Sequence, residues 1–556
     1  MPDASEGASE GAFDDAVAEY LEDIFTQHPT TATFLGRTEW DHDLGDPTAA
    51  GFEAREAATM GWLDRFAGFQ PEALTAEQRV DLSLLLAQLG ESVGTADFAG
   101  WRRNATTYLS NGIFELFVHG NRSEVDATAA ALDRLSQVPA ALSAGRANLD
   151  PTLIDPELLR QWGIPNVAAQ ANFMRSGLGV FVADAALRQQ LERAGVEAAA
   201  AYESFGEFLT DLAERASGSF VFGEERYDTV LKVGEGFAFG ARELREMGRQ
   251  QMEDLSARMS ALAEKIGGTS DWRAVVHGLR SEHPVDMDDL LRCYREETLK
   301  AREFVRHNGL MSIPSGERCA VEPAPIFRRA SAPVASYFQP PYYGPTGQGT
   351  FNVPFTPDGA SIDEQEARLR SNSFFEIPGV TAHEAYPGHH LHFAAAKATS
   401  ALRQVLTSTY MIEGWGLYVE QMMGEQGFYE SLAAQLGQLS MRMFRAGRIV
   451  VDTSLHLGEM TREEATTFMS ERCGFPEPTA RGEVLRYCSW PTQASSYLTG
   501  ALEIERMAGQ WIAEGHGTLR EFHDALARSG KLPLGVAARA IGLLPPPEER
   551  AWHRAD

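Results

Sequence analysis

The sequence has few cysteines and no leader-like start. Its four cysteines are widely separated and lack the Cys-x-x-Cys spacing of a metal or redox site: Cys293, Cys319, Cys473 and Cys488. Such usage is typical of a reduced protein with buried thiols. The first ten residues contain no basic residue and no apolar run, so they do not resemble a signal peptide. We therefore expect a cytoplasmic protein.

Positive charge and long apolar runs are also scarce. The chain has 49 basic and 78 acidic residues, which gives a net charge of −29. Nucleic acids and anionic membranes bind basic surfaces, so neither is an expected partner. No run of eighteen apolar residues occurs, so no membrane-spanning helix is expected. The length of 556 residues and a hydrophobic content of 44% predict a globular protein with a large core.

Most of the chain shows the apolar periodicity of amphipathic helices. Residues 1–12 are small and acidic and are predicted to form a disordered tail. The most regular helix is expected to start near Ala241, where leucine, methionine and isoleucine residues form a packing stripe. We expect residues 13–556 to form a single large helical domain, or two interlocked lobes over 13–310 and 311–556.

One segment departs from the helical pattern. Residues 312–360 are rich in proline, glycine and aromatic residues, which predicts short strands, above all Thr350–Pro354. An extended peptide can add to an edge strand through main-chain hydrogen bonds, which makes Asn352 a candidate substrate-binding residue. A proline-rich connecting loop is the alternative. The expected fold class is mainly α with a small β-sheet near the motif described next.

Residues 381–392 read Thr-Ala-His-Glu-Ala-Tyr-Pro-Gly-His-His-Leu-His. His383 and Glu384 look like the start of a His-Glu-x-x-His helix, in which two imidazoles hold Zn²⁺ and the glutamate acts as general base. The position of the second histidine is Pro387, however. The regular spacing of four residues is therefore absent.

A break at Pro387 and Gly388 offers a way around this spacing. Proline lacks the helical N–H and glycine tolerates unusual dihedrals, so the chain can bulge and return His389 to the face of His383. His390 would lie about 10.5 Å from His383 along an unbroken helix, a long reach for one ion. The spacing favours His389 as ligand, with His390 as the alternative.

Glu413 is the expected third ligand, in the run Glu-Gly-Trp-Gly-Leu-Tyr-Val-Glu at residues 413–420. The glycines of this run allow close approach of helices. One Zn²⁺ with these ligands keeps a coordination position open for water. Glu420 lies seven residues later on the same helical face, where it is either a partner that orients a ligand or a surface acid.

Two further groups of polar residues follow. Arg445, Arg448, Asp452 and His456 form a ridge along one predicted helix. The ridge is either a salt-bridge ladder or a way to position His456 as a hydrogen-bond donor to developing negative charge.

Residues 486–497 bring together arginine, tyrosine and glutamine side chains around Pro491. Tyr497 is the candidate donor to the oxyanion of a tetrahedral intermediate. Arg486 and Tyr487 are candidates for substrate binding, because an arginine fork suits a carboxylate.

These blocks, in this order, resemble the bacterial family of domain of unknown function 885. The resemblance implies a mostly helical protein similar to gluzincin-type carboxypeptidases and oligopeptidases, with the metal at the bottom of a deep cleft. His392 stands where this family commonly has Gln and Ser454 where it commonly has Gly, so His392 adds a further candidate ligand.

The sequence thus predicts a zinc-dependent peptidase acting on short peptides, with Glu384 as base and Tyr497 and His456 as oxyanion donors. A metal-dependent amidase acting on a non-peptide substrate would use the same residues. A non-catalytic helical binding protein is the other alternative. A di-iron bundle is disfavoured, because the Glu-x-x-His pairs it needs are interrupted by Pro387 and Gly416.

Overall fold

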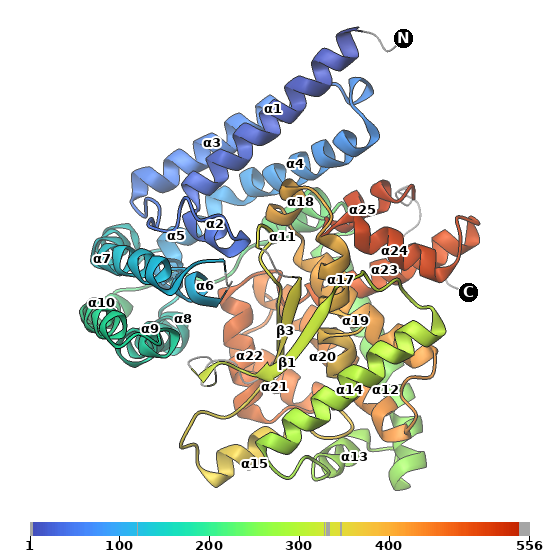
Figure 1. The fold of residues 1–556 in the computed structure, drawn as a ribbon. Helices are drawn as coiled ribbons and strands as arrows, with labels where there is room; N and C mark the ends of the chain where they lie inside the picture. Colours follow the sequence, from blue (N-terminus) through green and yellow to red (C-terminus); the bar gives the residue numbers. More distant parts are fainter. Residues whose placement is uncertain are drawn as a thin grey trace. The chain divides into compact units, whose positions relative to one another are not determined.

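Helices dominate the protein (Figure 1), which confirms the predicted mainly helical class. The computed structural model describes residues 4–109, 111–118, 121–326, 329, 334–344 and 347–543. Within these ranges, no helix is both long and apolar enough to cross a membrane.

The chain divides into two compact units. The first comprises Met1–Phe222 with Pro341–Thr346, and the second Gly223–Pro340 with Gly347–Asp556. The division at Phe222 differs from the lobe boundary near residue 310. The reason is packing: α12 (Ala241–Gly267) lies along α20 (Leu432–His456), so the helices after Phe222 share the core of the second unit.

In its described part, the first unit contains helices and connecting loops but no strand. Its α-helices are α1 (Ala4–Gln27), α2 (Pro29–Leu35), α3 (Ala49–Ala67), α4 (Ala76–Thr95), α5 (Gly100–Arg103), α6 (Ile113–Val118), α7 (Glu124–Asn148), α8 (Pro156–Leu158), α9 (Ile164–Ser176) and α10 (Ala185–Ala213). Helix α10 packs on α7 and α9 around Leu135, Val167 and Phe205. Helix α1 includes residues 4–12 of the expected tail, where alanine and glutamate favour helix. Residues 1–3 lie outside the described part.

The second unit adds a small sheet to its helices. Its elements are α11 (Glu224–Thr229), α12, α13 (Trp272–Leu279), α14 (Met287–Asn308), β1 (Arg318–Pro323), β2 (Ser336–Phe338), β3 (Gln348–Val353), α15 (Ile362–Arg370), α16 (Ile377–Glu384), α17 (His389–Ala396), α18 (Ala401–Val405), α19 (Thr409–Glu425), α20, α21 (Arg462–Cys473), α22 (Glu477–Ser489), α23 (Ser496–Ala513), α24 (Leu519–Ser529) and α25 (Leu534–Ala540). The helix predicted from Ala241 is confirmed as α12, with Leu244, Met252 and Met259 buried.

The sheet has the order β1-β3-β2, with β3 parallel to β1 and antiparallel to β2. Helix α14 packs against β1, and α17 lies next to β3 (Figure 1). The strand expected at Thr350–Pro354 is present as β3, but it is central and not an edge strand. A substrate cannot add to it, because neighbours already pair with both sides.

Asn352 is correspondingly unsuited to substrate binding. Its side chain is 3% exposed, and Nδ2 lies 3.5 Å from the carbonyl oxygens of Ser336 and Thr350. Ser336 is its register partner in β2. The role predicted for Asn352 is therefore replaced by one within the sheet.

Candidate metal centre

The predicted break in the histidine motif is confirmed. Helix α16 ends one residue after His383, and α17 begins at His389. A Cβ at Gly388 would lie 1.8 Å from the His383 carbonyl oxygen, so only glycine lets the chain fold back here. Trp415 Nε1 donates a hydrogen bond of 2.9 Å to the Pro387 carbonyl and fastens this loop to α19.

The fold-back brings His383 and His389 to the same carboxylate. The Nε2 atoms of both rings lie 3.5 Å from Glu413 Oε2, and the ring centroids are 4.6 Å apart with planes at 84°. Two ligand atoms bound at 2.0–2.1 Å to a tetrahedral ion lie roughly 3.3–3.4 Å apart. Both N–O distances are therefore close to the spacing of two ligand atoms on one Zn²⁺, which these three side chains could hold.

Glu384 is the second carboxylate at this place. It offers an oxygen that lies within 4.8 Å of a ring nitrogen of His383 and of His389. Glu413 lies closer to the rings, because its Oε2 is 3.5 Å from both Nε2 atoms, so either carboxylate could join the two histidines at a metal. Glu384 Oε2 is buried and has no hydrogen-bond partner in the described part of the chain. An unpaired carboxylate oxygen beside a metal centre is free to accept a proton.

Glu420 orients His383. Its Oε1 accepts a hydrogen bond of 2.8 Å from His383 Nδ1, and its side chain is 1% exposed. Since a carboxylate only accepts, Nδ1 carries a proton, and it is Nε2, facing Glu413, that would give up its proton to bind a metal. Glu420 is thus the orienting partner and not a surface acid. Gly416 leaves room for the ring, because a Cβ there would lie 2.4 Å from His383 Cε1.

The charged groups of the cluster shift one another's pKa values. Burial alone would lower the pKa of His383, but hydrogen bonds to Glu413 and Glu420 outweigh burial and raise it to about 10. Burial alone would raise the pKa of Glu413, but His383 and His389 hold it well below its usual range. Burial raises the pKa of Glu384. A divalent cation competes with protons for the same lone pairs, so this donor set fits a metal.

The alternative histidine ligands point elsewhere. His390 is fully buried, with Nε2 2.6 Å from Glu317 Oε2 and Nδ1 3.0 Å from the Tyr337 hydroxyl. His392 packs on the Trp415 ring, with centroids 5.0 Å apart. Burial lowers the pKa of His392 to about 3 and keeps it neutral. Of the histidines in the motif, His383 and His389 are the two that the structure brings to Glu413.

Tyr497, on α23, lies beside the cluster as predicted. Its ring stacks on that of His383, with centroids 6.4 Å apart and planes at 20°. Its hydroxyl accepts a hydrogen bond of 3.4 Å from Gln493 Nε2 and keeps its own proton for donation. Burial raises the pKa of Tyr497, so the hydroxyl stays protonated at neutral pH.

His456 is held by the protein interior instead. Its side chain is fully buried, and Nε2 donates a hydrogen bond of 3.0 Å to the Tyr487 carbonyl. Asp452 Oδ1 lies 3.8 Å from the same nitrogen, and the other oxygen of Asp452 accepts from the Tyr227 hydroxyl at 2.5 Å. A ring without solvent exposure does not face a substrate. The prediction of an oxyanion donor at His456 is replaced by a role in core packing.

Tyr487 and Arg486 belong to an internal network around Glu483. The Glu483 carboxylate accepts from the Tyr487 hydroxyl at 2.8 Å, from Arg448 Nη2 at 2.7 Å and from Arg486 Nη2 at 3.0 Å. Arg486 Nη1 also donates to Gln493 Oε1 at 2.8 Å. Tyr487 is 1% exposed and Arg486 is already paired, so neither is poised to bind a substrate.

Glu317 is a supporting residue that the sequence does not reveal. It accepts hydrogen bonds from Tyr386 Oη at 2.7 Å, His390 Nε2 at 2.6 Å and two nitrogens of Arg302 at 2.9 and 3.0 Å. It thereby fixes the loop that carries His389. Tyr386 and His390, four residues apart in the motif, signal a shared acceptor, but only the fold brings Glu317 to them.

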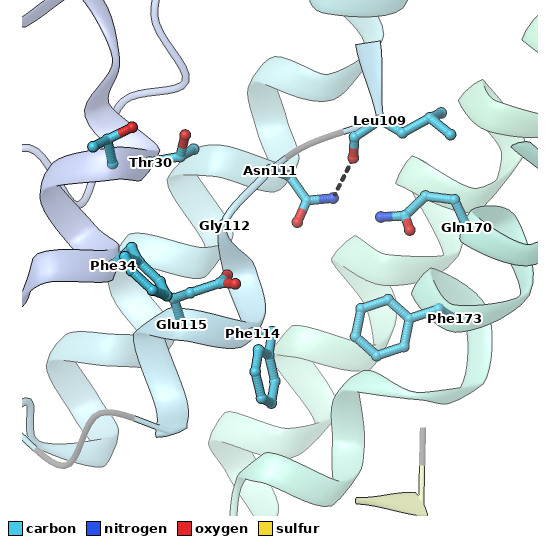
Figure 2. A pocket seen from close by; sticks show the side chains of 10 residues that line it. Thr30, Phe34, Leu109, Asn111, Gly112, Phe114, Glu115, Gln170 and Phe173 are labelled. Atoms are coloured by element: carbon cyan, nitrogen blue, oxygen red, sulfur yellow. Dashed lines mark hydrogen bonds between the residues drawn. The ribbon is translucent and has the colours of Figure 1, made fainter. Parts of the chain in front are cut away.

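A pocket of about 350 Å³ lies in the first unit and contains none of the predicted site residues. In Figure 2, Phe34, Phe114 and Phe173 surround it together with Glu115, and Asn111 donates to the Leu109 carbonyl at 3.4 Å. The chemistry predicted from the sequence belongs to the second unit.

Comparisons with known proteins agree with this fold. The family described as "Bacterial protein of unknown function (DUF885)" matches residues 29–541. A candidate lipoprotein of unknown function from Shewanella oneidensis has a similar structure, with a TM-score of 0.78 and 21% identity over 97% of this chain and 99% of that one. A second candidate lipoprotein, from Colwellia psychrerythraea, has a TM-score of 0.79 and 20% identity over 96% and 98% of the two chains.

At these identities the two structures establish the fold alone. No curated protein matches the chain significantly. Because the family model spans most of the sequence, the protein belongs to the bacterial DUF885 family of unknown function.

Proposed function

We propose that this protein is a zinc-dependent hydrolase that cleaves peptide bonds in short peptides. His383, His389 and Glu413 would hold one Zn²⁺. The observation that carries the proposal is that Nε2 of each histidine lies 3.5 Å from the same oxygen of Glu413. When bound, the ion polarises the scissile carbonyl and acidifies the attacking water.

Glu384 would act as the general base. Its unpaired Oε2 accepts a proton from the attacking water and returns it to the leaving amine. Burial raises the pKa of Glu384, which helps the carboxyl group to hold that proton between the two steps. Tyr497, stacked on His383, would donate its hydroxyl proton in a hydrogen bond to the tetrahedral oxyanion.

We further infer that the cluster opens into a substrate cleft, as in gluzincin-type peptidases. The side chain of Glu413 is 19% exposed while those of His383 and His389 are 7% and 10% exposed. A buried set of ligands with one partly open carboxylate is what a cleft floor requires. Water is then largely excluded from the histidines but has access to the open coordination position.

Glu384→Gln tests the mechanism. The variant should keep the zinc content of the parent, because the ligands are unchanged, and lose about 10²–10⁴-fold in turnover of a peptide panel. Glu425→Gln, an exposed position at the end of α19, is the matched control and should match the parent. A zinc-free parent, or a Glu384→Gln enzyme as fast as the parent, would overturn the proposal.

The same panel should include non-peptide amides. A metal-dependent amidase uses the same residues, so hydrolysis of amides without hydrolysis of peptides would replace the proposed substrate class. For location we propose the cytoplasm, because all four cysteines are free thiols. The two similar structures are described as candidate lipoproteins, which would be found with membranes. Cell fractionation therefore tests the proposed location, and recovery in the membrane fraction would overturn it.

A further inference from the structure

Arg445, on α20, lies close to the histidine–glutamate cluster. Its guanidinium carbon is 5.5 Å from the centre of the Tyr497 ring, and that ring stacks on His383. Burial raises the pKa of Glu384 and the positive charge of Arg445 opposes that rise, while burial lowers the pKa of Arg445 and the charges of Glu420 and Glu413 oppose that fall. The guanidinium is therefore part of the electrostatic surroundings of the cluster.

The neighbouring arginines on the same helix are paired. Arg442, one turn earlier, has Nη1 2.9 Å from Glu505 Oε1. Arg448, one turn later, donates to Glu483 at 2.7 Å and to the Tyr487 hydroxyl at 3.1 Å. Each of these guanidinium groups has a carboxylate as partner.

Arg445 has none. In the described part of the chain its hydrogen bonds run from Nη1 to the carbonyl oxygen and the sulfur of Met441, both at 3.4 Å, and no carboxylate lies within 4.0 Å. The residue is 7% exposed, and its Nε is buried with no hydrogen-bond partner in the described part of the chain. Leaving a guanidinium buried and unpaired is costly, so an anion that binds there gains a strong, charge-assisted contact.

Arg486 and Arg448 are less suited than Arg445 to bind an anion, because each already has a carboxylate partner. Both donate to the single carboxylate of Glu483, and Arg486 also donates to Gln493. Arg448 and Arg486 thus share the carboxylate of Glu483, and Arg445 is the arginine beside Tyr497 that has no ion-pair partner in the described part of the chain. The sequence also offers Arg445 no partner on its own helix, because positions 441, 442, 448 and 449, three and four residues away, hold no acidic residue.

We propose that Arg445 binds the free C-terminal carboxylate of the peptide substrate, so that the enzyme removes residues from the C-terminus. This inference rests on the proposed hydrolase function. The Tyr497 ring centre is 6.4 Å from that of His383 and 5.5 Å from the guanidinium carbon of Arg445, so the guanidinium is at most about 12 Å from the His383 ring, a range that a terminal residue of about 3.3–3.6 Å and the contacts at its two ends could span. The planar fork of arginine fits a carboxylate in two parallel hydrogen bonds.

The experiment compares an N-acetylated peptide as its free acid with the same peptide as its C-terminal amide. The parent should show a kcat/KM at least about 10-fold higher for the acid, because an arginine–carboxylate contact distinguishes the two ends. Arg445→Gln should reduce this preference to near unity. Arg442→Gln, which removes an equally buried arginine one turn away, should retain it.

Two outcomes on the catalytic side overturn the inference while leaving the hydrolase intact. In one, the parent cleaves acid and amide equally well. In the other, Arg445→Gln lowers turnover of both by the same factor, which would make Arg445 only a counter-charge for Glu384 and Glu420. Either result separates this inference from the proposed function.

If no peptide is hydrolysed, a binding measurement tests whether Arg445 binds the carboxylate. Thermal unfolding of the parent with the acid or the amide measures ligand stabilisation without turnover. The acid alone should raise the melting temperature of the parent and of Arg442→Gln, and should have no effect on Arg445→Gln. Equal shifts with acid and amide, or an undiminished shift in Arg445→Gln, would refute a carboxylate site at this residue.

Discussion

At the scale of single residues, His383 is positioned by one face of α19. Glu413, Gly416 and Glu420 stand at steps of three and four residues and contact Nε2, the ring edge and Nδ1 in turn. The helix therefore supplies a ligand, the space for the imidazole and the acceptor that fixes its tautomer. This division of work explains why a glycine lies between two glutamates.

Glu420→Gln should weaken zinc binding without removing a ligand. The amide still accepts a hydrogen bond from His383 Nδ1, but it no longer carries the charge that makes the imidazole a stronger donor to the metal. We expect zinc affinity to fall about 10–100-fold, measured by competition with a chelator. Glu425→Gln on the same helix should leave the affinity unchanged, and equal affinities in the two variants would contradict an orienting role.

At the scale of elements, close packing of α19 on α23 places Glu413 and Tyr497 on the same site. A Cβ at Gly414 would lie 2.6 Å from the Cα of Gly500, and a Cβ at Gly500 would lie 2.0 Å from the Tyr410 carbonyl. Both contacts are with backbone, which cannot swing away. The two helices can approach this closely only with glycine at the crossing.

Gly414→Ala should therefore separate the helices. We expect the free energy of unfolding to fall by about 1–3 kcal/mol, as for other overpacked sites, and zinc affinity to fall with it, since Glu413 moves. Urea unfolding measures the first and chelator competition the second. Gly509→Ala is the control: nothing lies within 4 Å of its Cβ, and alanine should stabilise α23 by up to about 1 kcal/mol. Equal midpoints for the two variants would disprove the backbone clash.

Local chemistry explains which elements the sequence could predict. The break after His383 could be predicted because proline and glycine act on their own dihedrals, and the approach of Glu413 to the two histidines because it lies on a following helix beside glycines that allow close packing. The small sheet was likewise indicated by composition. These are features whose causes lie within a few residues of one another.

Features that depend on partners distant in sequence could not be predicted in the same way. The central place of β3 follows from pairing with β1 and β2, which no pattern within residues 348–353 reveals. Tyr487 and His456 have the side chains that a catalytic site uses, yet burial against Glu483 and the Tyr487 carbonyl turns both inward. Residue type indicates what a group can do, and packing decides whether a substrate reaches it.

At the scale of the whole molecule, every residue of the candidate centre comes from the second unit. Helices α16, α17, α19, α20 and α23 supply the residues around the two histidines, within residues 377–513, and Glu317, which supports the loop, belongs to the same unit. The family match nevertheless spans residues 29–541 and so includes most of the first unit. The helical first unit is thus part of what defines the family, although the proposed chemistry requires none of its side chains.

Stability of the molecule should fall with acid through His523 in α24. Its side chain is 1% exposed, Nδ1 donates to the Leu310 carbonyl at 2.7 Å, and Nε2 accepts from the Tyr418 hydroxyl at 2.7 Å. Burial lowers the pKa of His523 from 6.5 to about 4. The neutral ring satisfies both contacts, and the protonated ring loses the bond from Tyr418.

The sign follows from proton binding. Between about pH 6.5 and pH 4 the unfolded chain binds a proton at His523 that the folded chain does not, so this stabilisation is complete above about pH 6.5 and decreases as pH falls. His523→Asn keeps a donor and an acceptor but cannot titrate. Urea unfolding measures the free energy of unfolding of both proteins. The amount by which His523→Asn is less stable than the parent should shrink by up to about 3 kcal/mol between about pH 7 and pH 4, because only the parent loses stability through this residue. If the stability difference between the two proteins stays constant with pH, His523 keeps an ordinary pKa in the folded protein.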